Sequence, residues 1–127
     1  MTISNESGEF NYSVTSSTFS TPPGGGTEVA INVEGDVSGF GQMNGTLRMV
    51  TPAPGANAGS VTFRGAAFAD GGEVIGTTAE GHWVKLDGQH KWRVRGINVN
   101  SQGQVFVSDG TLDLGTRSFS GTFSEWT

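Results

Sequence analysis

The chain has no cysteine, only two histidines, and seven scattered lysine and arginine residues among its 127 residues. Without cysteine it can form neither a disulfide nor a zinc or iron–sulfur site held by thiolates. Two histidines are too few for a metal site built from histidine alone, so we expect no metal and no other cofactor. The net charge of −5 and the lack of a basic stripe argue against a nucleic-acid partner.

Long hydrophobic runs are also missing from the sequence. No apolar stretch approaches the roughly 20 residues that a membrane-spanning helix needs. The segment Met1–Gly8 is polar and lacks the apolar core of a signal peptide. These features predict a cytoplasmic protein with no membrane partner. The length suits one domain that covers residues 1–127.

Glycine is abundant instead, with 21 residues placed between or inside short apolar runs. The runs alternate with the period of β-strands, and no window carries a convincing helical period. The predicted strands are Glu9–Ser16, Glu28–Glu34, Val37–Val50, Ser60–Ala69, Glu73–Leu86, Gln89–Asn100, Gln104–Leu114 and Arg117–Trp126. Eight strands in a meander leave two unpaired edges unless they close. The sequence therefore predicts an all-β fold, an eight-stranded antiparallel up-and-down β-barrel.

The tight turns between the last four strands fix which side chains share a face. Asp87-Gly88 is typical of a two-residue type I′ hairpin turn. A two-residue turn there would pair Lys85 with His90 and Trp83 with Trp92. The two tryptophans would then lie opposite each other on the inner face of the barrel, each burying about 150–250 Å².

The other predicted turns extend this inner face around the barrel. They are Glu34-Gly35-Asp36, Asp70-Gly71-Gly72, Ser101-Gln102-Gly103 and Gly115-Thr116. Each turn length gives an apolar inner face, and this agreement between strands supports the barrel. The apolar inner positions are Phe10, Tyr12, Val14, Val29, Ile31, Val33, Val37, Met43, Leu47, Met49, Val61, Phe63, Ala67, Ile75, Ala79, Trp83, Trp92, Val94, Phe106, Leu112, Leu114, Phe119 and Phe123.

Glycines also face inward in this register, at Gly65, Gly96, Gly110 and Gly121. One interpretation is that they allow sharp coiling of the strands at barrel corners. The other is that they leave room inside, since an eight-stranded barrel is just wide enough to be filled by side chains or to hold one small ligand. The sequence leaves both interpretations open.

The meander places the two long loops, Ser17–Thr27 and Thr51–Gly59, at the same end of the barrel. Long loops in compact domains often serve function, so we expect a mouth at this end. The predicted substrate-binding residues are Trp83, Trp92, Met49 and Lys85 near the mouth, with Phe63 and Asn98 deeper. Aromatic and apolar lining with a few polar groups is the usual composition of a small-molecule pocket.

Two residues are candidates for catalysis. His90 is the only histidine on the predicted inner face, and histidine can act as a general base near neutral pH, although a solvated position beside the turn is the commoner case. Tyr12 could donate a hydrogen bond to a ligand carbonyl or to the backbone. His82 and Glu80 fall on the outer face, where a cross-strand ladder with Arg93 and Arg95 is the better interpretation.

The strand layout, with Gly39-Phe40-Gly41 followed by Asn44-Gly45-Thr46-Leu47, resembles the allene oxide cyclase-like barrels. This resemblance implies a cyclase or isomerase that folds a flexible, largely apolar substrate inside its lumen. Proximity and orientation would then supply much of the catalysis. The resemblance assigns no catalytic residue to a numbered position of this chain.

Three hypotheses about function follow from the residues. The first is a barrel that binds and converts a small apolar molecule, and the second is a carrier without catalysis that has the same pocket. The third is a packed barrel that acts through its surface. In each case the outward apolar positions predict a homodimer or higher oligomer. These positions are Ile97, Val99, Val105 and Val107.

Overall fold

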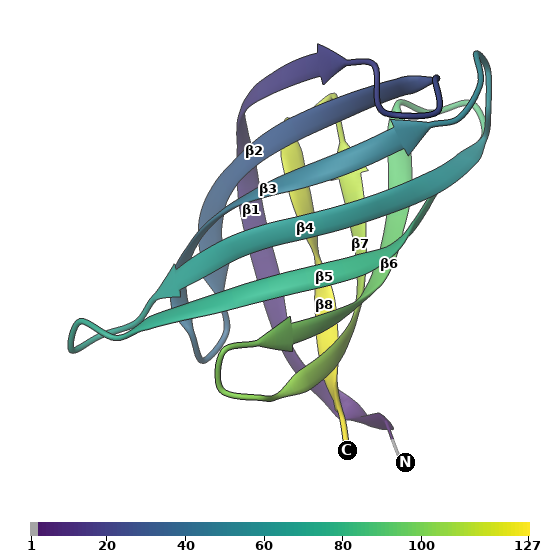
Figure 1. The fold of residues 1–127 in the computed structure, drawn as a ribbon. Coiled ribbons are helices and arrows are strands. Elements are labelled where there is room, and N and C mark those ends of the chain that lie inside the picture. Colours follow the sequence, from purple (N-terminus) through teal and green to yellow (C-terminus); the bar gives the residue numbers. More distant parts are fainter. Residues whose placement is uncertain (1–2) are drawn as a thin grey trace.

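The computed structural model describes residues 3–127, with side chains from Gly8 onward. In that part of the chain it contains eight antiparallel strands and no helix, which confirms the predicted all-β fold (Figure 1). The strands are β1 (Ile3–Ser20), β2 (Thr27–Val37), β3 (Gly41–Thr51), β4 (Ala58–Phe68), β5 (Val74–Lys85), β6 (Lys91–Asn100), β7 (Val105–Asp113) and β8 (Ser118–Trp126). No helix that could cross a membrane occurs among the described residues.

The sheet closes because β1 pairs with both β2 and β8, which confirms the up-and-down barrel. The closure is staggered. From Tyr12, successive paired residues through β2, β3 and β4 lead to Ile75 on β5. The opposite route through β8, β7 and β6 leads to Lys85 on the same strand. Such a stagger tilts the strands against the barrel axis, as the oblique course of β3 to β5 shows in Figure 1.

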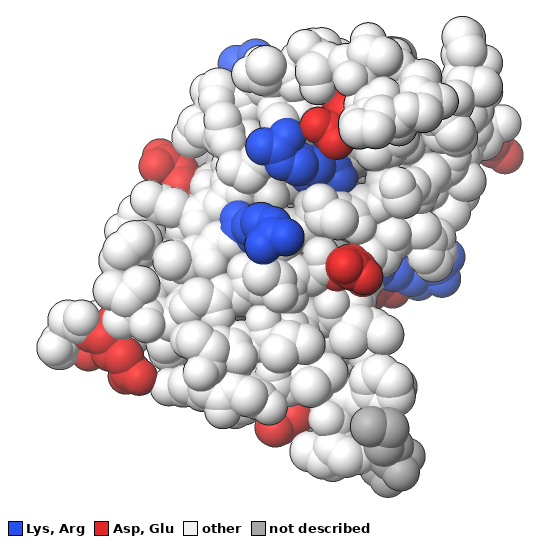
Figure 2. Space-filling model, viewed as in Figure 1, with Lys and Arg blue, Asp and Glu red and all other residues white. Residues whose placement is uncertain are grey.

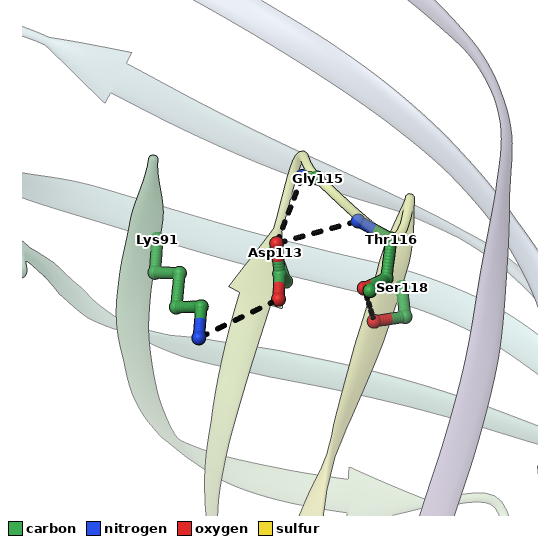
Figure 3. A network of polar contacts seen from close by, with 5 residues as sticks. All are labelled: Lys91, Asp113, Gly115, Thr116 and Ser118. Atoms are coloured by element: carbon green, nitrogen blue, oxygen red, sulfur yellow. Dashed lines mark hydrogen bonds and ion pairs between the residues drawn. The ribbon is translucent and has the colours of Figure 1, made fainter. Parts of the chain in front are cut away.

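Three of the predicted turns are confirmed with their register. Ser101-Gln102-Gly103 separates the paired Val99 and Val105, and Gly103 has a φ of 81°. Asp70–Gly72 and Gly115-Thr116 also lie where the sequence places them. At the last of these turns a carboxylate oxygen of Asp113 accepts hydrogen bonds from the backbone N–H groups of the two turn residues (Figure 3).

The chain turns at Asp87-Gly88 as predicted, because the Gln89 N–H donates a hydrogen bond of 3.3 Å to the carbonyl oxygen of Leu86, but the predicted register is wrong. Lys85 pairs with Trp92, and Trp83 pairs with Val94, so the loop between β5 and β6 contains four residues rather than two. The Lys85 ammonium group donates hydrogen bonds to the carbonyl oxygens of Leu86 and Gln89 in this loop. Trp83 and Trp92 therefore lie diagonally across the two strands instead of directly opposite each other.

The turn predicted at Glu34–Asp36 is wrong as well. These residues continue β2, and the chain turns at Ser38–Phe40 instead. Gly35 marks a close approach between strands, since a Cβ atom there would overlap the carbonyl oxygen of Asn11 on β1. Glycine at such a point permits a barrel corner rather than a turn.

The inner face keeps its predicted residues despite these two errors. Both corrections shift the pairing by an even number of residues, and only an odd shift moves side chains to the other face. The buried side chains are Phe10, Tyr12, Ile31, Val33, Met43, Leu47, Met49, Val61, Phe63, Ala67, Ile75, Trp83, Val94, Phe106, Leu112, Phe119 and Phe123, all predicted to face inward. Leu114 is the clear exception, because it is exposed beside the last turn.

Candidate functional site

The two ends of the barrel differ in packing. At the end that carries the long loops, Trp83 is 2% exposed, and its indole N–H donates a hydrogen bond of 2.9 Å to the carbonyl oxygen of Val50. Its ring lies over Gly59, where a Cβ atom would overlap it. Met49 and Leu112 are also buried at this end. Large side chains therefore fill the inner face at the end where the sequence predicts a mouth.

A cavity of about 100 Å³ lies instead toward the opposite end. That end carries the short turns Ser38–Phe40, Asp70–Gly72 and Ser101–Gly103 and is called the tight-turn end. It reaches Phe40 in the β2–β3 turn and Asn100 before the β6–β7 turn. Its inward-facing side chains belong to Phe10, Tyr12, Val37, Met43, Leu47, Val61, Phe63, Ala67, Ile75, Thr77, Ala79, Val94, Asn98, Asn100, Phe106, Ser108, Phe119 and Phe123. This lining is mostly aromatic and aliphatic, as in pockets that hold small organic molecules.

Tyr12 is the central polar group of this lining. Its ring lies parallel to that of Phe63, with 6.2 Å between centroids, and tilted against that of Phe10 at 5.2 Å. The residue is 8% exposed. Its hydroxyl has no hydrogen-bond partner among residues 8–127, the part of the chain whose side chains are described. Burial raises the pKa of Tyr12 because the phenolate would lose its hydration. The hydroxyl therefore stays protonated and is free to donate.

Four further polar side chains line the cavity from β5, β6 and β7: Thr77, Asn98, Asn100 and Ser108. The Asn100 side-chain amide donates a hydrogen bond of 2.9 Å to the side-chain oxygen of Gln104. The Asn98 side-chain amide donates a hydrogen bond of 2.8 Å to the hydroxyl of Ser108. The hydroxyls of Ser108 and Thr77 each donate to a backbone carbonyl at 3.4 Å. The side-chain oxygen of Asn98 accepts no hydrogen bond from any described residue. The cavity thus offers one unused donor at Tyr12 and one unused acceptor at Asn98.

Phe40 lies at the cavity's turn end. It belongs to the Ser38–Phe40 turn, and its ring packs edge-on against Phe106 at 5.9 Å and tilted against Phe123 at 6.3 Å. Gly39 and Gly41 flank it with φ angles of 79° and 93°, which residues with a side chain seldom adopt. The turn therefore folds an aromatic ring back over the end of the lumen.

The inward glycines act in both of the ways left open by the sequence. The rings of Phe10 and Phe119 fill the space beside Gly110, and Gly121 allows a close approach to the backbone of β7. Gly96 does line the cavity, together with its partner Gly81. Because this pair has no side chains, its contribution to the wall is backbone alone. Glu80 and Arg95, whose side chains belong to the outer face, contribute to the lining at the same place.

The predicted site residues separate into two groups. Tyr12, Phe63 and Asn98 line the cavity together. Trp83, Trp92, Met49, Lys85 and His90 lie at the packed end and do not line it. His90 is exposed in the β5–β6 loop, where its backbone carbonyl accepts a hydrogen bond of 3.1 Å from the N–H of Leu114. The ammonium group of Lys85 lies 5.4 Å from the ring centroid of Trp92.

Sequence reasoning missed Phe40 as a cavity residue. The error has a definite source: the turn was predicted at Glu34–Asp36, which left Phe40 inside a strand. The two glycines that flank Phe40 were the available signal, because a Gly-x-Gly segment between two apolar strands is typical of a turn.

The outer face carries the other charged candidates. The guanidinium of Arg93 binds both carboxylate oxygens of Asp109, at 3.0 and 2.6 Å, and this bond lowers the pKa of Asp109. His82 pairs with Arg95, and Glu80 pairs with Ile97. The cross-strand ladder on the outer face is therefore shifted by two residues from the predicted register. Among the described residues no three His, Cys, Asp or Glu side chains are grouped as a metal site would require.

Comparison with known proteins gives no further guide, because no family model, no curated protein and no solved structure matches the chain.

Proposed function

We propose that the barrel binds one small, largely apolar molecule in the cavity at its tight-turn end. The observation that carries this proposal is Tyr12, a residue that is 8% exposed within an aromatic lining and whose hydroxyl has no hydrogen-bond partner among the described residues. This hydroxyl is not completely enclosed by protein atoms, so it can reach a molecule held in the cavity. A ligand that accepts a hydrogen bond from Tyr12 would gain that contact in surroundings that are otherwise largely apolar.

The chemistry available in the cavity suits binding and polarisation more than proton abstraction. A phenol whose pKa is raised by burial can donate a hydrogen bond to a carbonyl but cannot act as a base near neutral pH. Asn98 could accept a hydrogen bond from the same ligand. In the enzyme version, a cyclase or isomerase of the kind that the resemblance implies, the walls would fold the substrate and Tyr12 would polarise it. In the carrier version the same contacts would only hold it.

The size of the cavity limits the ligand. A cavity of about 150 Å³ lined by apolar side chains binds benzene, and this one measures about 100 Å³. The cavity therefore suits a molecule of about one ring. A larger substrate would need Phe40 and its turn to move away from the lumen.

Methionine methyl NMR tests the proposal directly. Met43 lines the cavity, whereas Met49 is equally buried at the packed end and does not line it. Titration with single-ring compounds such as benzamide, benzyl alcohol and cyclohexanone is expected to shift the Met43 methyl signal saturably and to leave Met49 unchanged. The proposal fails if no compound in the panel moves Met43.

Three variants sharpen that titration. Tyr12→Phe is expected to weaken binding of benzamide by about 3–10-fold, the worth of one hydrogen bond. Ala79→Leu fills the lumen from β5 and is expected to abolish binding. His90→Ala is the control and is expected to change nothing. For an enzyme substrate found later, the same Tyr12→Phe variant separates the two versions, because it would lower turnover in a cyclase or isomerase.

The outer apolar surface supports a second candidate function, association into a homodimer or higher oligomer. Ile97 and Val99 on β6 are 45% and 46% exposed, and they pair with Val107 and Val105 on β7. Contiguous apolar surface of this kind marks contacts between proteins. Light scattering on Val99→Lys should show loss of the oligomer, with Gln42→Lys on β3, away from β6 and β7, as the control. A monomeric unmodified chain would contradict this candidate. The cytoplasmic location stays a prediction.

A further inference from the structure

Charge is distributed unevenly between the two ends of the barrel. The tight-turn end carries five exposed carboxylates, here called the acidic rim: Glu9, Glu34, Asp36, Asp70 and Glu73. Its three turns contain no lysine or arginine. In Figure 2 the lower part of the molecule accordingly shows red groups and no blue ones. The basic residues lie elsewhere, at Arg48, Arg64, Lys85, Lys91, Arg93, Arg95 and Arg117.

The negative charge of the acidic rim is not neutralised locally. The ion pairs of the described side chains join Arg48 to Glu28, Lys91 to Asp113 and Arg93 to Asp109, and none includes a rim residue. Glu73 accepts a hydrogen bond of 2.9 Å from the Gln102 side chain, which is uncharged. Charges of one sign gathered at one end of a barrel create a field that repels ions of the same sign over about one Debye length, roughly 8–10 Å.

The cavity behind the rim offers no net positive charge to an anion. Its inward-facing polar groups are uncharged, and they are the hydroxyls of Tyr12, Thr77 and Ser108 and the amides of Asn98 and Asn100. Arg95, whose Nε atom is buried without a hydrogen-bond partner among the described residues, lines the wall together with Glu80, so the two charged residues at that place have opposite signs. An anion would therefore lose its hydration without meeting a net positive charge.

From these two observations we infer that the lumen is selective for uncharged ligands of about one ring, with a hydrogen-bond acceptor for Tyr12, and that the acidic rim excludes anions. This inference rests on the proposed function and adds a ligand class to it. Fatty acids and other carboxylates are thereby excluded, whereas amides, ketones and alcohols fit the cavity. The acceptor of the ligand would lie deep, against Tyr12, and its apolar part between the rings of Phe63 and Phe106.

Benzamide and benzoate form a matched pair for the test, since they share size and shape and differ in charge. With the Met43 methyl signal as the reporter, benzoate is expected to bind at least about tenfold more weakly than benzamide, a difference of about 1.4 kcal/mol. Higher salt concentration is expected to strengthen benzoate binding and to leave benzamide binding unchanged, because salt screens only the repulsion of the charged compound.

A variant that removes rim charge isolates the part played by the rim. The triple variant Glu34→Gln, Asp36→Asn and Asp70→Asn changes only exposed side chains, so the fold should be kept. It is expected to strengthen benzoate binding about 3–10-fold at low salt and to leave benzamide binding as it was. A second triple variant, Glu28→Gln, Asp87→Asn and Asp113→Asn, removes the same charge at the packed end and should leave both affinities unchanged.

The outcomes separate this inference from the function on which it rests. If neither compound moves the Met43 signal, the proposed function fails. If both compounds bind equally well, or if benzoate binding does not respond to salt and to the rim variant, the lumen binds ligands but the rim does not select them. The inference is then overturned while the proposed function stands.

Discussion

The long-loop end and the tight-turn end of this barrel are built from the same eight strands, yet one is packed and the other is hollow. At the packed end the inner face carries Trp83, Met49 and Leu112, which are buried and fill the space. At the hollow end the corresponding positions carry Ala67, Ala79 and Ser108 around the cavity. The volume of the inward side chains therefore decides where space remains.

The comparison teaches that loop length is a poor guide to where a barrel opens. The long loops Ser17–Thr27 and Thr51–Gly59 suggested a mouth between them, but a loop outside the barrel says nothing about the side chains inside it.

Trp83→Ala should give the largest effect, because it breaks the packed end. The ring is 2% exposed and its N–H is bonded to the Val50 carbonyl. Its removal is expected to lower the free energy of unfolding by about 3–5 kcal/mol, measured by chemical denaturation. Phe40→Ala is the contrast at the hollow end, where the ring is only half-buried, and its cost should be clearly smaller. Equal costs would mean that the two ends are packed alike.

Gly81→Ala is expected to give the next largest effect. A Cβ atom at Gly81 would overlap the carbonyl oxygen of Arg95 and lie 2.6 Å from the Cα atom of Gly96, so the backbones of β5 and β6 must separate. We expect a loss of about 1–3 kcal/mol in the free energy of unfolding. Gly76→Ala is the matched control on the same strand, because a Cβ atom there meets nothing within 4 Å. A similar loss in both variants would show that the close approach at Gly81 is not the cause.

Much of the fold could be predicted from the sequence, and the reason is the period of two along a strand. The errors at Asp87-Gly88 and Glu34–Asp36 changed the pairing by an even number of residues, so the inner face was still assigned correctly. The pairing itself could not be obtained from turn residues alone. Asp87-Gly88 does form a turn but inside a longer loop, and Gly35 lies within β2 at a close approach to β1 rather than in a turn.

The candidate site was less predictable than the fold. Tyr12, Phe63 and Asn98 were named because they are polar or aromatic groups on the inner face, and they do line the cavity. Their neighbours in the prediction, Trp83 and Lys85, depended on the assumed mouth. Which layer of a barrel stays hollow follows from how staggered strands stack side chains from all eight strands, and pairwise turns do not reveal that stagger.

The pH dependence of stability tests whether Tyr12 is buried at the hollow end. Because its pKa is raised in the folded barrel above the usual value of about 10, its contribution to stability is complete below about pH 10 and declines as the pH rises further. Tyr12→Phe should therefore reduce the loss of stability above pH 10 and should cost less than about 1 kcal/mol near neutral pH. Tyr12 is the only tyrosine of the chain, so the ultraviolet absorbance of tyrosinate reports on this one group. Ionisation of the folded protein at the usual pH would contradict its burial.

Asp113→Asn should give the smallest effect, and it concerns the packed end (Figure 3). Burial alone would raise the pKa of Asp113, but hydrogen bonds from the N–H groups of Gly115 and Thr116 and the charge of Lys91 lower it. A lowered pKa stabilises the fold above the unfolded value of about 3.9, and this stabilisation is lost as the pH falls. The variant keeps an oxygen for the turn and loses only the charge. Its stability should therefore lie slightly below that of the unmodified chain at neutral pH and converge with it in acid.

Asp87→Asn is the control for that last variant, because Asp87 lies in the β5–β6 loop without a hydrogen bond or ion pair among the described residues. Its stability curve should follow the unmodified chain at every pH. If Asp113→Asn did the same, the charge of Asp113 would contribute nothing to the turn, and Asp87 and Asp113 would be equivalent. A difference confined to Asp113 would instead show that its charge, held beside Lys91 and the N–H groups of the last turn, helps to stabilise this end of the barrel.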